Sequence, residues 1–210
     1  TSGHLSAFKS YGDTLAIAFD GVTYHSSQKI HCDNCTHRRD RNGDTHYYHK
    51  AIIPVIVKPE SPHVLSLPPE CIVPQDGHKK QDCERAAVKR WLSQHHGRYQ
   101  EQTVTFLGDD LYANQPLCEL IEQTYHQFFL FVCKPDSHTT LYTQLNLLDD
   151  AHELESKQVV KQGQIWSYRW RNDLPLRASE DALSVNWLEL TLTDDVTGEV
   201  LYRNAWATNH

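Results

Sequence analysis

Two aspartates follow short apolar segments at positions where a strand would end. Asp20 closes the run LAIAF, and Asp109 follows the run TVTFLG. Carboxylates that converge from separate strand ends suit a pair of Mg²⁺ ions held about 3.5–4 Å apart, the arrangement that serves phosphoryl transfer. We therefore expect Asp20 and Asp109 to be catalytic residues that bind Mg²⁺ or Mn²⁺. The alternative is that an Asp before a Gly only ends a strand and begins a turn.

Asp110 stands beside Asp109 and competes with it for this role. Adjacent residues of an extended segment point to opposite sides, so only one of the two carboxylates can face a metal.

A second group of residues has the types that bind zinc. Cys32 and Cys35 are separated by two residues, and so are His46 and His49. Two thiolates and two imidazoles suit tetrahedral Zn²⁺, which would order the charged stretch between them. The spacing departs from a zinc finger, and nearby His residues are further possible ligands, namely His31 and His37. Free cysteines in a mobile loop are the alternative, and a redox pair is disfavoured because no thioredoxin-like helix follows.

Basic and acidic residues near these motifs have two interpretations each. Arg38, Arg39 and Arg41 form a dense basic patch that would contact DNA phosphates, although a charge run is usually a solvated loop. Asp82 and Glu84 open a predicted helix, where acids favour the helix dipole, although Glu84 could face the site.

The elements that must position these residues indicate an α/β fold. Apolar runs predict strands at 14–20, 50–58, 63–67, 103–107 and 128–133, and helical spacing predicts helices at 79–96 and after Asn114. The order is β-β-β-α-β-α-β, with the Pro59–Pro62 stretch turning the second strand into the third. A short helix at 138–148 and alternating aromatic-rich strands at 159–160, 164–171, 187–193 and 200–207 follow.

Composition limits the class of protein. The chain has 210 residues, 39% hydrophobic and 22% charged, and no apolar run as long as a membrane span, so we expect a soluble, cytoplasmic protein. It contains six Cys in a pattern that fits a reducing compartment. It contains no Met, so we expect a fragment. The net charge of −7 argues against a domain that binds DNA by charge alone, unless bound metal ions offset it.

Several segments resemble the catalytic domain of DDE-type insertion-sequence transposases. They are LAIAFDGVTYHSSQKIHCDNC, THYYHKAIIPVIVKP, QDGHKKQDCERAAVKRWL, LGDDLYANQPLCELI, FFLFVCKPDSH, YRWRNDLPLR and GEVLYRNAWATNH, which together cover nearly the whole chain. The resemblance implies a ribonuclease-H-like mixed sheet with a zinc-loop insertion. It implies a core of residues 1–136 with the Cys/His loop at 31–49, and a β-rich insertion subdomain of residues 137–210.

The resemblance also implies roles for individual residues. Asp20 in FDG matches the first catalytic acid and Asp109 in GDDLY the second. The third, a Glu on a helix, is expected shortly after NAWATNH, so we expect these 210 residues to bind metal weakly and to lack catalysis. Cys32, Cys35 and the His49 of YYH are favoured as the zinc ligands. Tyr168, Arg169 and Arg171 resemble an element that such transposases place near the DNA backbone, and the alternative is an ordinary strand with one aromatic face.

The expected partner is double-stranded DNA, as the ends of a mobile element and its target, and the resemblance implies a homodimer. A second hypothesis is an inactive zinc-stabilised nucleic-acid-binding remnant of such an element. A third is a ribonuclease-H-like nuclease without a role in transposition.

Overall fold

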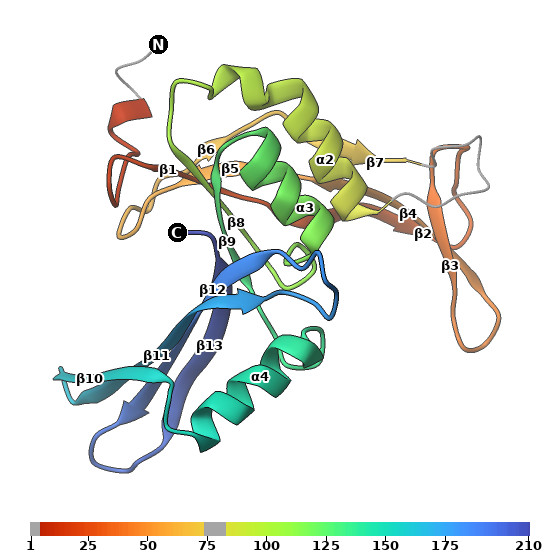
Figure 1. Ribbon diagram of the computed structural model, residues 1–210. Helices are drawn as coiled ribbons and strands as arrows, with labels where there is room; N and C mark the ends of the chain where they lie inside the picture. Colours follow the sequence, from red (N-terminus) through yellow and green to blue (C-terminus); the bar gives the residue numbers. More distant parts are fainter. Residues whose placement is uncertain (1–4, 74–82) are drawn as a thin grey trace. The chain divides into compact units, whose positions relative to one another are not determined.

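The protein is a mixed α/β protein, described by a computed structural model over residues 5–73 and 83–210 (Figure 1). The first strands are β1 (Leu15–Ala18), β2 (Gly21–Ser27), β3 (Thr36–Arg39), β4 (Thr45–Ile52), β5 (Val55–Val57), β6 (Leu65–Ser66) and β7 (Glu70–Ile72). Helix α2 (Glu84–His95) follows, then β8 (Val104–Gly108), α3 (Gln115–Glu119) and β9 (Phe128–Val132). The last elements are α4 (Thr139–Asp150), β10 (Glu155–Lys161), β11 (Gln164–Pro175), β12 (Ser184–Asp194) and β13 (Val200–Thr208).

The strands form two sheets. The nine-stranded mixed sheet has the order β10-β11-β12-β13-β9-β8-β1-β5-β6. The four-stranded antiparallel sheet places β4 between β2 and β3, and β7 also pairs with β4. The chain divides into two compact units, residues 1–105 and 106–210, and β8 contributes to both. The predicted boundary near residue 136 remains a prediction.

In the first unit, β5 pairs antiparallel with both β1 and β6. Leu15 and Ile17 point into the core and are fully buried. Helix α2 covers this core, as its spacing predicts, with Ala87, Val88, Trp91 and Leu92 fully buried. The predicted start of this helix, at residues 79–82, lies outside the described residues.

The predicted strand at 50–58 is wrong, because the structure has two strands there. Residues 50–52 end β4 in the four-stranded sheet, and β5 belongs to the nine-stranded sheet. Pro54 lies between them and has no N–H to donate to a ladder, so the chain changes sheets at this residue.

In the second unit, β9 and β10 to β13 form an antiparallel ladder. The strands predicted in the last third of the chain all lie within β10 to β13. A helical connection joins β8 to β9, and such a connection suits neighbouring parallel strands. Asn114 precedes α3 as predicted, but its side chain donates to the carbonyls of Leu111 and Tyr112 instead of capping the helix.

In the described part of the chain, no helix has the length and apolar character needed to cross a membrane.

Candidate functional site

Cys32, Cys35 and His49 meet at the base of the β3–β4 hairpin. The two Sγ atoms lie 3.9 Å apart, and the Nε2 atom of His49 lies 3.4 Å from Cys32 Sγ and 3.3 Å from Cys35 Sγ. Tetrahedral zinc, with Zn–S bonds of about 2.3 Å and Zn–N bonds of about 2.0–2.1 Å, places two sulfurs about 3.8 Å apart and a sulfur and a nitrogen about 3.6 Å apart. The three atoms therefore have the separations that a shared Zn²⁺ ion requires.

The backbone explains why these residues meet. Thr36 pairs with Tyr48 in the β3–β4 ladder, so Cys35, one residue earlier, comes opposite His49. A turn closed by a hydrogen bond from Cys35 N to Cys32 O brings the second thiol back to the first. Cys32 N–H also points to Cys35 Sγ, and the ring of Tyr24 stacks on the imidazole of His49. The predicted zinc-binding group therefore fits the metal with three ligands.

His46 does not join this group. It lies three positions before His49 on β4, and residues at odd separations on a strand point to opposite faces. Its Nε2 lies 3.2 Å from Asp40 Oδ2, at the hairpin turn. Burial alone would raise the Asp40 pKa, but hydrogen bonds from His46 and from two backbone N–H groups of the turn lower it below its usual value. The other possible ligands, His31 and His37, have ring contacts with Tyr47.

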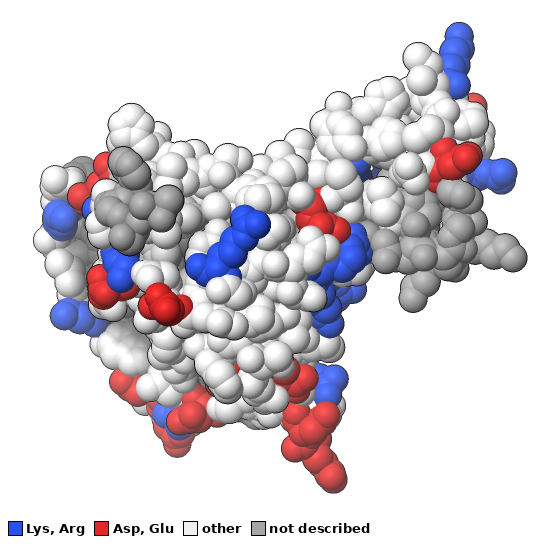
Figure 2. Space-filling view, turned by 90° about the horizontal axis from the view of Figure 1, so that it is seen from above, with Lys and Arg blue, Asp and Glu red and all other residues white. Residues whose placement is uncertain are grey.

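The predicted basic patch lies on the same hairpin. Arg38 and Arg39 are exposed on β3, and Arg41 is exposed in the turn. Within the described residues, no ion pair occupies these three guanidinium groups. On the molecular face in Figure 2, Lys and Arg side chains are scattered among Asp and Glu side chains instead of forming one large basic surface. The three arginines therefore make this hairpin a small positively charged region on a chain whose net charge is −7.

Asp20 lies two residues after the end of β1 and directly before β2. It is exposed between β1 and β2, and its carbonyl accepts a hydrogen bond from Ile53 N. The carboxyl group of Glu84, the first residue of α2, lies so close to Gly21 that a Cβ added there would overlap it. The sequence alone does not show that the Glu84 side chain lies against the backbone next to Asp20. The only indication in the sequence is Gly21, since a Gly in a strand often marks a place where another group approaches the backbone closely.

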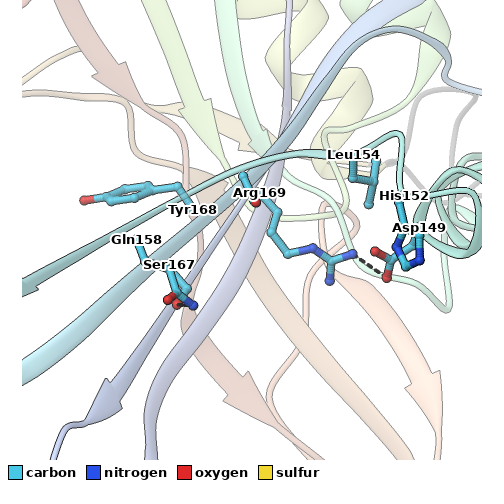
Figure 3. Close-up of a pocket in the computed structure, with 8 residues that line it drawn as sticks. Asp149, His152, Leu154, Gln158, Ser167, Tyr168 and Arg169 are labelled. Carbon is cyan, nitrogen blue, oxygen red and sulfur yellow. Dashed lines mark hydrogen bonds and ion pairs between the residues drawn. The ribbon is translucent and has the colours of Figure 1, made fainter.

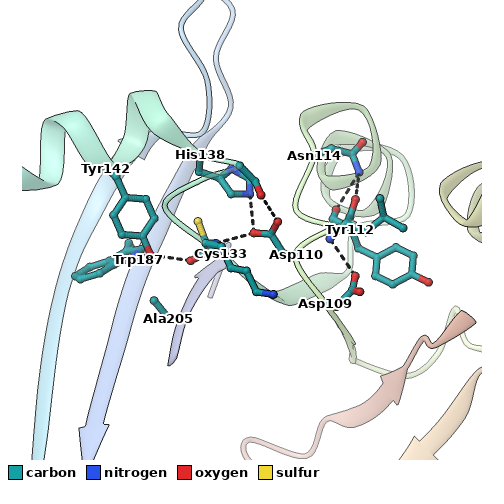
Figure 4. Close-up of polar contacts among 12 residues, drawn as sticks. Asp109, Asp110, Tyr112, Asn114, Cys133, His138, Tyr142, Trp187 and Ala205 are labelled. Atoms are coloured by element: carbon teal, nitrogen blue, oxygen red, sulfur yellow. Dashed lines mark hydrogen bonds and ion pairs between the residues drawn. The ribbon is translucent and has the colours of Figure 1, made fainter. Parts of the chain in front are cut away.

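Asp109 and Asp110 have different surroundings, as Figure 4 shows. Asp109 is exposed directly after β8, and its Oδ1 accepts the N–H of Leu111. Asp110 Oδ1 accepts the N–H of Lys134 at 2.6 Å, and its Oδ2 accepts the hydroxyl of Ser137. Asp110 thus anchors the turn after β9, whereas the Asp109 carboxylate is accessible.

His138 extends the environment of Asp110. Its Nε2 lies 3.4 Å from Asp110 Oδ1, and its side chain is 7% exposed. Burial lowers the pKa of His138, and the neighbouring Asp110 carboxylate opposes that effect. The imidazole is therefore mainly neutral at pH 7 and fills a structural position beside Asp110.

The predicted DNA-contacting residues of β11 take part in contacts within the second unit. Arg169 forms ion pairs with Asp149 at 2.6 Å and with Glu189 at 3.5 Å, and Arg171 donates to the Glu153 carbonyl. Arg169 and Tyr168 border an open pocket of about 420 Å³ between the end of α4 and the β10–β11 ladder (Figure 3). The two carboxylates hold Arg169 and would compete with a DNA phosphate for it.

Among the described residues, the Cys32, Cys35 and His49 group is the only cluster of three or more His, Cys, Asp or Glu side chains with metal-binding geometry. Comparison of the chain with models of known protein families gives no match, and comparison with curated protein sequences gives none either.

Proposed function

We propose that this chain is the catalytic region of a DDE-type insertion-sequence transposase, an enzyme that cleaves and joins DNA phosphodiesters with divalent metal ions. The observation that carries the proposal is the position of Asp20 and Asp109. Each follows a strand, β1 and β8 respectively, and these two strands are neighbours in the nine-stranded sheet. Acids at the ends of neighbouring strands are well placed to share metal ions.

The order of elements supports a ribonuclease-H-like core. The nine-stranded sheet and its helices follow the chain as β1, β5, β6, α2, β8, α3 and β9, the β-β-β-α-β-α-β succession that the apolar pattern of the sequence predicts. β10 to β13 then form the predicted β-rich region, and β2, β3, β4 and β7 include the Cys/His segment. We propose that the first group is the core and the others are insertions.

In the proposed function, each metal ion and the arginines of the hairpin have a separate role. Asp20 and Asp109 would hold Mg²⁺ or Mn²⁺, which supplies positive charge to the phosphate under attack. Zn²⁺ bound by Cys32, Cys35 and His49 would fix the base of the β3–β4 hairpin and so hold its arginines in one orientation. Arg38, Arg39 and Arg41 would contact DNA phosphates, an interaction that weakens as salt rises.

The direct test of the activity is a strand-cleavage and strand-joining assay. The protein is the product of the longest open reading frame that includes these 210 residues, and the DNA is a duplex with the terminal sequence of the element. We expect Mg²⁺-dependent nicking and joining that disappear in Asp20→Asn and in Asp109→Asn. Asp110→Asn, the matched control, keeps most of the activity. Cleavage without joining would instead indicate a ribonuclease-H-like nuclease.

A second candidate function is a zinc-stabilised nucleic-acid-binding protein without catalysis. The Cys32, Cys35 and His49 geometry favours it, because the described residues contain a group suited to zinc and no comparable carboxylate cluster. It predicts DNA binding that requires Arg38 and Arg39 and is unchanged in Asp20→Asn and Asp109→Asn, with no cleavage under any metal. Binding measured at two salt concentrations, together with the cleavage assay, separates the two functions.

A further inference from the structure

Lys134 lies at the same end of the nine-stranded sheet as Asp109. It comes two residues after β9, and β9 is the neighbour of β8, which Asp109 follows directly. The N–H of Lys134 donates to Asp110 Oδ1 at 2.6 Å, so the turn after β9 contacts the residue next to Asp109. Lys134 and Asp109 both belong to the second unit. A basic side chain therefore starts beside the accessible Asp109 carboxylate.

The backbone of Lys134 is held in place. Its carbonyl accepts the N–H groups of Ser137 and His138, in addition to the hydrogen bond that its own N–H donates. Pro135 follows, and a residue before proline is restricted to an extended backbone. Cys133 is buried, and adjacent side chains of an extended segment point to opposite sides, so the exposed Lys134 side chain points outward.

The ammonium group of Lys134 is accessible to an anion. Within the described residues, no carboxylate forms an ion pair with it. The Asp110 side chain is only 16% exposed and accepts the Lys134 N–H and the Ser137 hydroxyl. A lysine side chain extends roughly 6 Å from its Cα, and successive Cα atoms are about 3.8 Å apart. The ammonium can therefore reach the space in front of Asp109.

We propose that Lys134 binds the DNA phosphate that the metal ion of Asp109 also contacts. This inference rests on the proposed function and adds a cation to which the sequence resemblance gives no role. A lysine ammonium binds phosphate as a compact point charge. Negative charge on the phosphoryl oxygens must be stabilised in the transition state, and a fixed cation beside the metal ion contributes to this.

Cleavage kinetics give the first test, with the same protein and duplex as in the assay of the proposed function. Lys134→Ala lowers the cleavage rate at saturating DNA by about 10²-fold, and Lys134→Arg, which keeps the charge, retains most of the rate. The control is Lys161→Ala, which removes another exposed lysine, at the end of β10, and leaves the rate unchanged. Circular dichroism checks that each variant is folded.

Binding to DNA with one neutral phosphate locates the contact without requiring cleavage. Affinities are measured with Ca²⁺ in place of Mg²⁺ on duplexes that each carry one methylphosphonate, at successive positions. At one position, the loss of charge weakens binding by the wild type several-fold more than binding by Lys134→Ala. The dependence of log affinity on log salt is also shallower by about one in Lys134→Ala. Lys161→Ala responds to the methylphosphonates as the wild type does.

The results distinguish this inference from the proposed function. If the wild type cleaves, a Lys134→Ala variant that cleaves at the same rate, or that shows additive effects at every phosphate, overturns the role of Lys134 alone. If the wild type binds the duplex but never cleaves it, the proposed function fails. The methylphosphonate series then decides whether Lys134 contacts a phosphate, and additive effects at every position overturn that contact. A wild type that does not bind the duplex overturns both.

Discussion

The Sγ atom of Cys35 lies 3.3 Å from the Nε2 atom of His49, at the base of the β3–β4 hairpin. This separation, together with Cys32 Sγ at 3.4 Å from the same nitrogen, predicts one Zn²⁺ per chain. Cys35→Ser and His49→Ala should each abolish zinc retention, whereas His46→Ala should keep it. Elemental analysis of protein purified under reducing conditions without chelators measures the zinc content. Equal zinc loss in the His46 variant would show that the ligand set is different.

Asp110 and Asp109 should differ in their effect on stability. Asp110 accepts the N–H of Lys134 and the hydroxyl of Ser137, so its loss leaves these donors without their carboxylate. We expect Asp110→Ala to lower the free energy of unfolding by about 1–3 kcal/mol. Asp109→Ala, at an exposed carboxylate, should change it by less than about 0.5 kcal/mol. Urea denaturation measures both, and a larger effect of the Asp109 substitution would contradict these assignments.

Gly21 and Glu84 should be energetically coupled. A Cβ at position 21 would overlap the Glu84 carboxyl group, which is the end of a flexible side chain and can swing away. Gly21→Ala should therefore destabilise the wild type by about 1 kcal/mol or less, and should be neutral or stabilising by about 0.4–1 kcal/mol in a Glu84→Ala background. A double-mutant cycle from thermal or urea unfolding gives the coupling. Additive effects would mean that Glu84 does not lie against Gly21.

Stability should decrease on mild acidification because of His138. Burial lowers the folded-state pKa of this imidazole below its usual value of 6.5, although Asp110 opposes the shift. The unfolded chain then binds a proton that the folded chain does not, so the free energy of unfolding falls as pH drops from about 6.5 towards the lowered pKa. His138→Gln should make this dependence shallower. Urea unfolding at pH 7.5 and 5.5 measures it, and an unchanged slope in the variant would assign the effect to other groups.

The sequence predicts the elements whose burial follows a clear period. Helix α2 follows from the spacing of Ala87, Val88, Trp91 and Leu92, and the alternating strands of the last third appear where expected. The four-stranded sheet is not predicted, because β2 and β3 are mostly polar and exposed and show no apolar period. Its order depends on cross-strand pairing, which joins residues distant in sequence.

The candidate residues are predictable only in part. The types and spacing of the Cys and His residues indicate zinc, and the resemblance favours His49, but the spacing alone does not separate His49 from His46; the alternation along β4 does. Likewise, the choice between Asp109 and Asp110 needs the turn at Lys134 to Ser137, which no local pattern in the sequence reveals.

Metal-directed cleavage of the polypeptide tests the central claim, that Asp20 and Asp109 share divalent ions. Fe²⁺ is bound in place of Mg²⁺ in a Cys32→Ser, Cys35→Ser background, and ascorbate with peroxide then generates hydroxyl radicals that cut the backbone beside the ion. Mass spectrometry locates the cuts. We predict cuts next to both Asp20 and Asp109, suppressed by excess Mg²⁺ and lost at both positions in Asp20→Asn alone or Asp109→Asn alone. Cuts beside one acid that persist when the other is replaced, or no specific cuts, would contradict a shared metal site.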